Sequence, residues 1–508
     1  MSLPLPGTPI IIDIGSAYVK IGFSGEPSPR FVFPCITGTE KYKSVMVDVS
    51  ARSIYVGNDV SRMRGVLKIQ HPIQRGEIMD WDSYYEVLNY IFYSLLRIDD
   101  LSNYPVFYCE APFMHGETKE YLARLFLETH RAKSLMMMPT PLLSLFSVGL
   151  TTGLVIESGD GLTWVVPIIN GQIVQHAVQK LSLGGTDVNQ NLKNLFMREG
   201  LNITSSSVDE IIKEIKEKNC YFILDPSDPP KTSDMFGVPM PDGSTISINN
   251  SVLYQAPEVL FDPGMVGYGN ILSVPQAVIA CLKGIDKSQW NYLLSHIVFS
   301  GGNLSYSGFE ERFELELNLL LPQLGEIPKS TTPLSEVTNE LIKLQTIETS
   351  KKKEDTCQHC GAFVDLSDGR ELCPSCGGRL ILPQIKLGLS IDSKKEKKRK
   401  QGTCPHCKKD VSDFESLFCP YCGKSLESFD TTSAPELSKQ TPPPFEFPVM
   451  LKKEDKLLKF FVPDNLQFAI FNGAAILGSL PSFQQLFITF EQFQTNKNLL
   501  YRDISEIL

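Results

Sequence analysis

Three glycine-containing turns, far apart in the chain, each follow an apolar run that predicts a buried strand. Glycine in such a turn lets backbone N–H groups approach phosphate oxygens at a distance where a Cβ atom would clash. One strand–glycine turn is weak evidence because the pattern is common, whereas three, two of them with an acid, predict a nucleotide-binding pocket. The apolar runs are residues 10–12, 154–156 and 297–299, and the turns are residues 13–20, 157–161 and 300–302.

Ionisable residues in two of these turns suit a metal–phosphate ligand. Asp13 and Glu157 each begin a turn, and such carboxylates hold a hydrated Mg²⁺ in nucleotide sites. Lys20 adds a cation for the phosphates. The sequence therefore predicts a nucleotide bound with Mg²⁺.

Longer segments around these turns form a recognisable set. They are residues 12–34 (IDIGSAYVKIGFSGEPSPRFVFP), 55–82 (YVGNDVSRMRGVLKIQHPIQRGEIMDWD), 110–112 (EAP), 151–167 (TTGLVIESGDGLTWVVP), 216–218 (KEK), 220–221 (CY), 300–302 (SGG) and 478–487 (GSLPSFQQLF). These segments resemble actin and the actin-related proteins, over roughly residues 8–322 and 455–497. The resemblance implies an α/β fold of two lobes, each built around a ribonuclease-H-like sheet, with ATP or ADP in the cleft between them.

The resemblance also implies a division into subdomains. Residues 38–55 have about the length of the family's DNase-binding loop, which is a filament contact, and residues 44–47 resemble its tip. Helices are expected at residues 84–96, 119–129, 192–197 and 208–218. Subdomain 1 would comprise residues 1–34, 72–147 and 469–508, subdomain 2 residues 35–71, subdomain 3 residues 148–183, 270–324 and 453–468, and subdomain 4 residues 184–269.

The resemblance further implies which residues surround the nucleotide. Lys216 and Glu217 alone would be an exposed helix pair, but in this context they are expected beside the ribose and adenine. Lys213 replaces an arginine of actin, and Gln467 replaces a lysine. The expected nucleotide-binding residues are Gly15, Ser16, Ala17, Lys20, Gly159, Asp160, Gly161, Gly185, Lys213, Lys216, Glu217, Gly301, Gly302 and Tyr306.

Three departures from the family pattern bear on hydrolysis. Thr140 and Trp164 stand where actin has the glutamine and histidine that position its attacking water. Thr140 is too short to reach the same water, and the indole of Trp164 can donate but not accept a proton. Glu157 replaces an aspartate and is one methylene longer. Asp160 remains as the candidate catalytic residue. The sequence predicts ATP binding with slow or absent hydrolysis, and the alternative is that another side chain has taken over the role.

Cysteine spacing gives the strongest local signal. Eight of the twelve cysteines form two modules, Cys-x2-Cys-x12-Cys-x2-Cys and Cys-x2-Cys-x11-Cys-x2-Cys. Four thiolates in this arrangement suit structural Zn²⁺, so two zinc ribbons are expected at residues 354–381 and 401–426; rubredoxin-type iron and redox disulfides are the alternatives. The expected ligands are Cys357, Cys360, Cys373 and Cys376, then Cys404, Cys407, Cys419 and Cys422; Cys35, Cys109, Cys220 and Cys281 are expected to be reduced core residues.

The ribbons lie in an insertion, residues 325–452, that interrupts the actin-like sequence. Residues 457–461 resume its strand pattern. The basic run at residues 394–400 is expected to be a solvated linker, with contact to nucleic acid or anionic lipid as the alternative. Protein partners are expected to dock on the ribbons.

Composition restricts the class of protein. The chain has 508 residues and a net charge of −10, which argues against a nucleic-acid coat, and cysteine usage suits a reducing, cytoplasmic setting. No secretory signal is apparent and no apolar run reaches the ~18 residues of a membrane helix.

Two functions are therefore open. The first is an ATP-binding protein of a cytoskeletal or filament-associated assembly, with self-assembly into filaments. The second is a non-filament scaffold subunit of a larger complex, with nucleic-acid association as one form of it. A kinase of the sugar-kinase type is disfavoured because no acidic base with a substrate pocket is visible. The CPxC ribbons favour an archaeal source.

Overall fold

The protein is described here by a computed structural model that covers residues 4–41, 54–200, 206–226, 229, 234–239, 245–325 and 457–502, and four short strands between 354 and 411. The chain divides into two compact units. The first is Met1–Leu341 with Phe445–Leu508, and the second is Ile342–Pro444.

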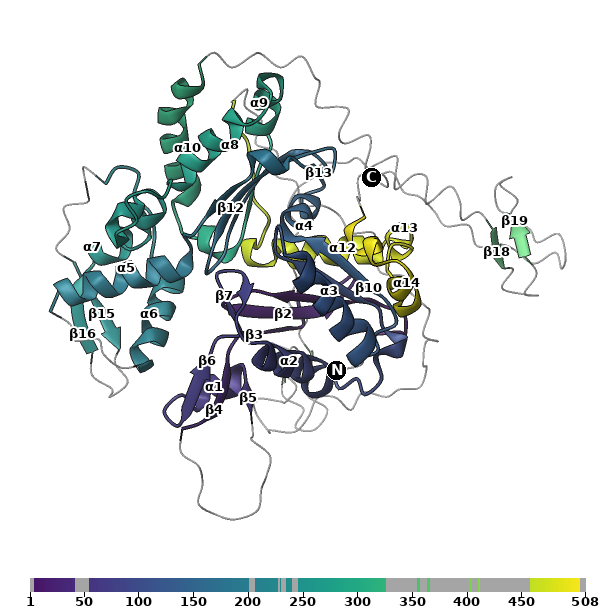
Figure 1. Ribbon diagram of the computed structural model, residues 1–508. Helices are drawn as coiled ribbons and strands as arrows, with labels where there is room; N and C mark the ends of the chain where they lie inside the picture. Colours follow the sequence, from purple (N-terminus) through teal and green to yellow (C-terminus); the bar gives the residue numbers. More distant parts are fainter. Residues whose placement is uncertain are drawn as a thin grey trace. The chain divides into compact units, whose positions relative to one another are not determined.

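Two sheets of the first unit share one topology (Figure 1). In each, three strands form an antiparallel meander, and two later strands add in parallel beside the first. The predicted strands at residues 10–12, 154–156 and 297–299 are confirmed. The first sheet, in order, is β10 (Leu135–Pro139), β9 (Val106–Glu110), β1 (Ile10–Ile14), β2 (Tyr18–Phe23) and β3 (Phe31–Pro34); the second is β13 (Gln172–Ile173), β12 (Thr163–Ile169), β11 (Gly153–Ser158), β17 (Ile297–Ser300) and β22 (Phe460–Phe461), with β14 (Gln179–Leu181) paired to β12.

Alternate residues of the central strands build separate cores on the two faces of each sheet. Ile10 and Ile12 pack beneath α2 (Trp81–Asn89) and α3 (Gly116–Arg124) on the outer face of the first sheet. Ile11 joins a core that also contains Val155 and Val298 of the second sheet. Helices α4 (Thr140–Ser147) and α12 (Ala469–Ser479) lie in that shared core, between the sheets (Figure 1). The shared core therefore joins the two lobes beneath the cleft.

The four expected helices are present. Two extend beyond their expected ends, and two continue as π-helical turns, which the sequence pattern does not distinguish from α-helix. The helices are α2 (Trp81–Asn89) with η1 (Tyr90–Leu95), α3 (Gly116–Arg124) with η3 (Leu125–Thr129), α5 (Gly185–Arg198) and α6 (Ser206–Asn219).

Each of the remaining elements belongs to one of the two lobes. The first lobe carries β4 (Thr37–Glu40), β5 (Tyr55–Val56), α1 (Asn58–Arg62), β6 (Leu67–Gln70), β7 (Ile73–Gln74), β8 (Glu77–Ile78), η2 (Leu101–Asn103), α13 (Pro481–Gln484), α14 (Phe490–Thr495) and η10 (Lys497–Tyr501). The second carries η4 (Gln175–Ala177), β15 (Met235–Pro239), β16 (Thr245–Asn249), α7 (Ser251–Gln255), η5 (Pro257–Leu260), η6 (Pro263–Val266), α8 (Val274–Lys283), α9 (Lys287–Leu294), η7 (Gly302–Leu304), α10 (Phe309–Leu320), η8 (Leu321–Leu324) and η9 (Leu466–Phe468).

The chain returns to the same sheet after the cysteine-rich segment. Strand β22 pairs in parallel with β17 and covers Phe460–Phe461, so the strand expected at residues 457–461 is present over its last two residues. Leu324, before the segment, and Leu458, after it, both belong to the outer core of the second lobe. The subdomain and insertion boundaries remain predictions.

In the second unit, two antiparallel strand pairs are described. They are β18 (Glu354–Thr356) with β19 (Phe363–Asp365), and β20 (Gly402–Thr403) with β21 (Asp410–Val411). In sequence, each pair encloses the first Cys-x-x-Cys of one predicted ribbon. The eight cysteines themselves, the basic run 394–400 and the loop tip 44–47 lie outside the described residues.

Cys35, Cys109, Cys220 and Cys281 are free and buried, which confirms their assignment as reduced core residues. No helix within the described ranges is long and apolar enough to cross a bilayer.

Candidate functional site

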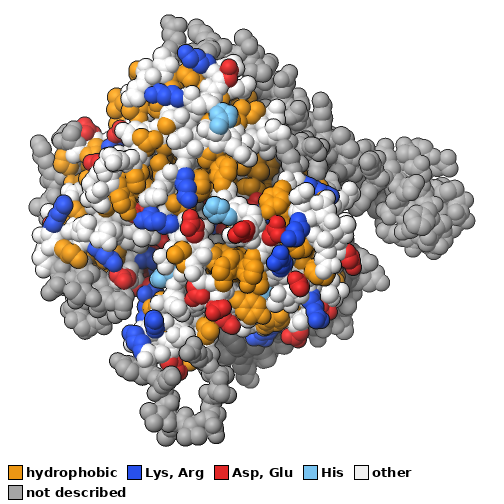
Figure 2. All heavy atoms as spheres, viewed as in Figure 1, with side chains coloured by type: hydrophobic (Ala, Val, Ile, Leu, Met, Phe, Trp, Pro, Cys, Tyr) orange, Lys and Arg blue, Asp and Glu red, His pale blue; other side chains and the backbone are white. Residues whose placement is uncertain are grey.

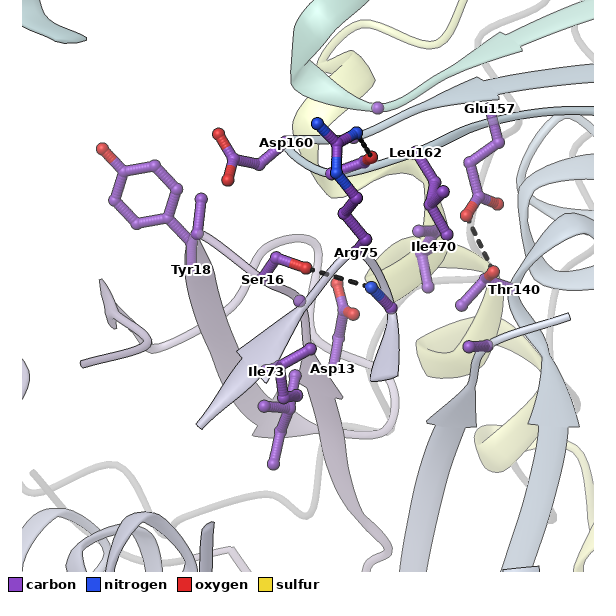
Figure 3. Close-up of a pocket in the computed structure, with 18 of the residues that line it drawn as sticks. Asp13, Ser16, Tyr18, Ile73, Arg75, Thr140, Glu157, Asp160, Leu162 and Ile470 are labelled. Atoms are coloured by element: carbon purple, nitrogen blue, oxygen red, sulfur yellow. Dashed lines mark hydrogen bonds between the residues drawn. The ribbon is translucent and has the colours of Figure 1, made fainter. Parts of the chain in front are cut away.

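A cavity of about 450 Å³ lies between the lobes of the first unit, at the ends of the central strands (Figure 3). All three predicted turns contribute to its walls. Cavities of this size hold small-molecule ligands. Of the predicted site residues, it is lined by Asp13, Gly15, Ser16, Ala17, Lys20, Glu157, Gly159, Asp160, Gly161, Gly185, Lys216, Glu217, Gly301, Gly302 and Tyr306.

The first two turns are equivalent hairpins, one in each lobe. The Gly15 N–H donates to the Tyr18 carbonyl at 3.0 Å between β1 and β2, and the Gly159 N–H donates to the Leu162 carbonyl at 2.9 Å between β11 and β12. The third turn has Gly301 at φ 91°, and a Cβ atom there would collide with the Ser158 carbonyl oxygen. Only glycine fits at this position, because both its conformation and its close contact exclude a side chain.

Asp13 and Lys20 form an ion pair in the wall of the first lobe. They face each other across the β1–β2 ladder, and Lys20 Nζ lies 2.7 Å from Asp13 Oδ2. The charge of this carboxylate is therefore already balanced by a cation of the chain.

Glu157 has a different environment. Its Oε1 accepts a hydrogen bond from Thr140 Oγ1 at 2.8 Å (Figure 3), and its Oε2 is buried with no hydrogen-bond partner among the described residues. Burial raises the pKa of Glu157 to about 7, against the opposing effect of the Thr140 hydrogen bond. Two departures from the family pattern, at positions 140 and 157, thus meet in one contact.

Trp164, the third departure, contributes an aromatic wall. It faces Glu157 across the β11–β12 ladder and is almost fully buried. The ring centroids of Phe113 and Trp164 are 5.9 Å apart, and Lys180 Nζ lies 5.4 Å from the centroid of the Trp164 ring. The indole therefore packs in an apolar and cationic environment and supplies no proton acceptor.

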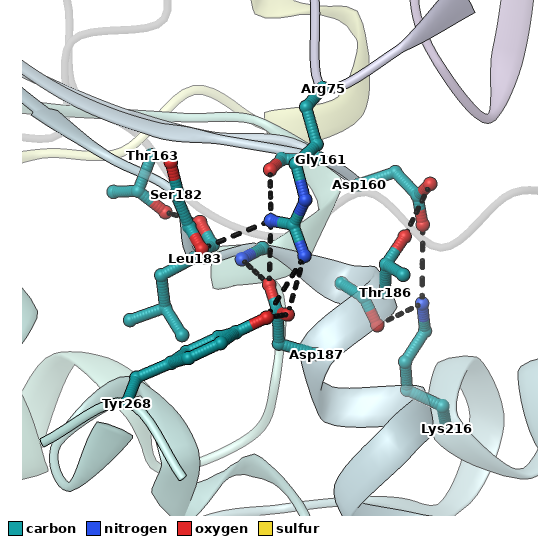
Figure 4. Close-up of polar contacts among 12 residues, drawn as sticks. Arg75, Asp160, Gly161, Thr163, Ser182, Leu183, Thr186, Asp187, Lys216 and Tyr268 are labelled. Atoms are coloured by element: carbon teal, nitrogen blue, oxygen red, sulfur yellow. Dashed lines mark hydrogen bonds and ion pairs between the residues drawn. The ribbon is translucent and has the colours of Figure 1, made fainter. Parts of the chain in front are cut away.

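Polar groups of the second lobe converge on Asp160 (Figure 4). Thr186 Oγ1 donates to its Oδ2 at 3.0 Å, and Lys216 Nζ lies 3.9 Å from its Oδ1. Lys216 also donates to the Gly185 carbonyl at 3.2 Å. Burial lowers the pKa of Lys216, an effect that Asp160 opposes. This end of the cavity thus holds a buried cation whose hydrogen-bonding capacity is not exhausted by these contacts.

At the expected adenosine side, Tyr306 is buried and donates to Asn303 Oδ1 at 3.1 Å. Tyr18 of the first lobe donates to both oxygens of Glu217, at 3.2 and 3.3 Å. Lys213 does not line the cavity: its Nζ lies 3.9 Å from the centroid of the Tyr18 ring, on the rim. Gln467 lines the cavity beside Gly302.

Arg75 is a cavity residue that the sequence analysis missed. It lies in the β7–β8 turn with φ 44°, and its guanidinium donates to the Gly161 and Ser182 carbonyls at 3.0 Å each and to Asp187 Oδ1 at 2.8 Å (Figure 4). Tyr268 donates to the same Asp187 oxygen at 3.0 Å. Arg75 therefore connects a hairpin of the first lobe to a turn and a helix of the second. The polar turn between Ile73 and Ile78 was the only local signal.

A sequence model of the family described as Actin matches residues 5–333. The chain belongs to the actin family. The match covers more than half of the 508 residues and ends ahead of the cysteine-rich segment.

Actin-family folds generally bind a nucleotide with a divalent metal, and the cavity suits that pair. Asp13 and Glu157 bring one carboxylate from each lobe to the same cavity, and the orphaned Glu157 Oε2 is a buried acceptor that a hydrated cation would satisfy. Within the described ranges, no cluster of three or more His, Cys, Asp or Glu side chains could hold a metal alone. Mg²⁺ fits this arrangement because it keeps several waters and takes further ligands from phosphate.

Proposed function

We propose that this actin-family protein binds ATP or ADP with Mg²⁺ in the cleft and acts in a cytoplasmic, cytoskeletal or filament-associated assembly. The observation that carries the proposal is that three glycine turns from two lobes line one cavity. Backbone N–H groups of these turns would hold the phosphates, and the buried Lys216 would face the adenosine side. Asp13 and Glu157 would hold the water shell of Mg²⁺, which neutralises phosphate charge when bound.

The proposal includes slow or absent hydrolysis. The Thr140 hydroxyl donates to Glu157, and Trp164 is enclosed by Phe113 and Lys180, so neither is placed to take a proton from water. Loss of such a group typically lowers a rate by ~10²–10⁴. Asp160 is the remaining candidate, although Thr186 and Lys216 already contact it.

The zinc ribbons are proposed to hold two structural Zn²⁺ ions and to dock protein partners. In support, each described strand pair of the second unit encloses in sequence a Cys-x-x-Cys with the spacing of zinc ligands. Nucleic acid is a weaker candidate partner. Figure 2 shows acidic and basic side chains interspersed on the visible face, without a broad area of one sign among the coloured residues.

The second candidate is a non-filament scaffold. Leu324 and Leu458, which flank the cysteine-rich segment, pack on one core of the second lobe. By resemblance this is a face that actin uses for longitudinal contacts, so an insertion there would obstruct filament growth. Sedimentation with Mg²⁺-ATP separates the two candidates, because only a filament former enters the pellet.

Nucleotide binding is tested by calorimetry with Asp13→Ala. The variant should bind Mg²⁺-ATP roughly 10- to 100-fold more weakly, since a carboxylate near the cation is lost. Asp59→Ala is the control, because Asp59 is an exposed surface residue whose ion pair with Arg62 is 3.5 Å long. Absence of heat and of a thermal shift for the wild type at millimolar ATP would refute nucleotide binding.

A further inference from the structure

Only one of the two oxygens of the Glu157 carboxylate accepts a hydrogen bond from the described residues. Its Oε1 accepts from Thr140 at 2.8 Å, while Oε2 is buried without a hydrogen-bond partner in the part of the chain that is described. A buried carboxylate oxygen is costly unless a donor or a cation compensates it. The side chain lines the nucleotide cavity, so the compensating group can come from a bound ligand.

Thr140 is placed to hold this carboxylate in one orientation. It is the first residue of α4, directly after Pro139 of β10, and it is buried. A threonine inside a helix can bond the carbonyl of the preceding turn, but at the first position no such turn exists. Its hydroxyl is therefore available to donate to Glu157. Ser144, one turn later, donates to Ser300 at 2.8 Å and has a smaller effect on the pKa of Glu157, which it lowers, as the Thr140 hydrogen bond does.

The charge balance of the cavity wall points to the same acid. Asp13 is paired with Lys20 at 2.7 Å, whereas Glu157 forms no ion pair in the described ranges. When Glu157 is ionised, its charge is therefore less compensated than that of Asp13, and a bound cation would favour this ionised form at the oxygen that Thr140 leaves free.

We propose that Thr140 is a positioning residue for the divalent cation that accompanies the nucleotide. Its hydroxyl fixes Oε1 of Glu157 and so presents Oε2 to the water shell of the cation. Thr140 itself touches neither cation nor nucleotide in this role. The inference rests on the proposed function, because it concerns the cation that binds with the nucleotide.

The test uses the full chain, a fluorescent etheno-ATP and a titration with MgCl₂. The readout is the Mg²⁺ concentration that gives half of the metal-dependent gain in nucleotide affinity. Thr140→Val keeps the shape and removes the hydroxyl, so this concentration should rise about 10- to 100-fold, the usual effect of losing an outer-shell partner. Thr140→Ser restores the donor and should return the value to near that of the wild type. Affinity measured in EDTA should be the same for all three proteins.

Thr37→Val is the matched control for the loss of a buried threonine hydroxyl. Thr37 is equally buried, donates to Ser83 Oγ at 3.0 Å and does not line the cavity. It should leave the half-saturating Mg²⁺ concentration unchanged.

Glu157→Asp provides a second, independent test of the proposed role of Thr140. Shortening the acid by one methylene withdraws it from the Thr140 hydroxyl, so this variant should resemble Thr140→Val, and combining the two should add nothing. An unchanged Mg²⁺ dependence in Thr140→Val, an equal loss of affinity in EDTA, or additive effects in the double variant would each overturn the inference while leaving nucleotide binding intact. Failure of the wild type to bind etheno-ATP under any condition would overturn the proposed function and this inference together.

Discussion

Trp164 lies across the β11–β12 ladder from Glu157, where the family pattern has a histidine. Its indole is buried and contacts Phe113 and Lys180, and its one ring nitrogen donates a hydrogen bond but does not accept a proton. The Thr140 hydroxyl is engaged by Glu157. At the scale of single residues, the described lining of the cavity keeps groups suited to phosphate and metal, and the side chains at positions 140 and 164 supply no acceptor like the histidine of the family pattern.

Replacing Trp164 tests this account of slow hydrolysis. Trp164→His introduces a ring nitrogen that accepts a proton, so phosphate release from ATP should accelerate by about 100-fold, the low end of what a positioned base contributes. Trp164→Phe keeps an aromatic ring without the acceptor and should stay at the wild-type rate. Equal acceleration by both variants would mean that the bulk of the indole, and not its chemistry, limits the rate.

At the scale of elements, the sequence predicted the strands and helices that carry a strong periodic or apolar pattern. The central strands β1, β11 and β17 were predicted because a buried strand needs a continuous apolar run. The glycine turns after them were predicted for the same local reason. Arg75 was missed because its role depends on Asp187 and Tyr268, which are more than one hundred residues away and have no local signature. Lys213 was expected in the cavity, but its contact with the Tyr18 ring holds it on the rim.

The Arg75 contact predicts how firmly the β7–β8 hairpin holds helix α5. Asp187 also accepts from the Gly184 N–H at 2.8 Å, so Arg75→Ala would leave a buried carboxylate with fewer donors. We expect etheno-ATP to dissociate about 10-fold faster, which corresponds to the loss of a charged hydrogen bond of ~1.4 kcal/mol. Arg62→Ala, which removes an exposed arginine paired with Asp59, should leave the rate unchanged. An unaltered rate in Arg75→Ala would show that the contact does not restrain the cleft.

His130 packs where α2 and η1 meet η3, and its burial predicts that the free energy of unfolding falls at acidic pH. It follows η3, stacks on Tyr85 with ring centroids 5.5 Å apart, and burial lowers its pKa to about 4. Because the folded pKa lies below the unfolded value of about 6.5, its neutral form stabilises the fold above pH 6.5, and this contribution is lost as the pH falls towards 4. The urea midpoint should therefore fall less between pH 7 and pH 5 in His130→Phe than in the wild type. His176→Phe, at an exposed histidine, serves as the control, and parallel profiles for wild type and His130→Phe would contradict the assignment.

At the scale of the whole molecule, the cysteine-rich segment is inserted before the last strand of the second sheet. The chain leaves after η8 and returns at β22, which pairs with β17, so the second lobe is completed only after the cysteine-rich segment. Unit boundaries at 341 and 445 separate that segment from the actin-family body. Domains of this kind generally fold on their own cores, and the energy of a structural zinc site belongs to the module that binds the metal.

This separation predicts how the proposed zinc modules behave. Elemental analysis should find two zinc ions per chain, and Cys404→Ser should lose one of them while etheno-ATP binding stays at the wild-type level. Deletion of residues 350–428 should remove both ions and preserve nucleotide binding, because Leu324 and Leu458 pack on the same core and a short linker can join the remaining ends. Loss of a partner without loss of filaments would identify the ribbons as adaptors, and filaments formed only by the deleted chain would identify them as a block to assembly. Collapse of the actin-family body on deletion would show instead that the segment contributes to its core.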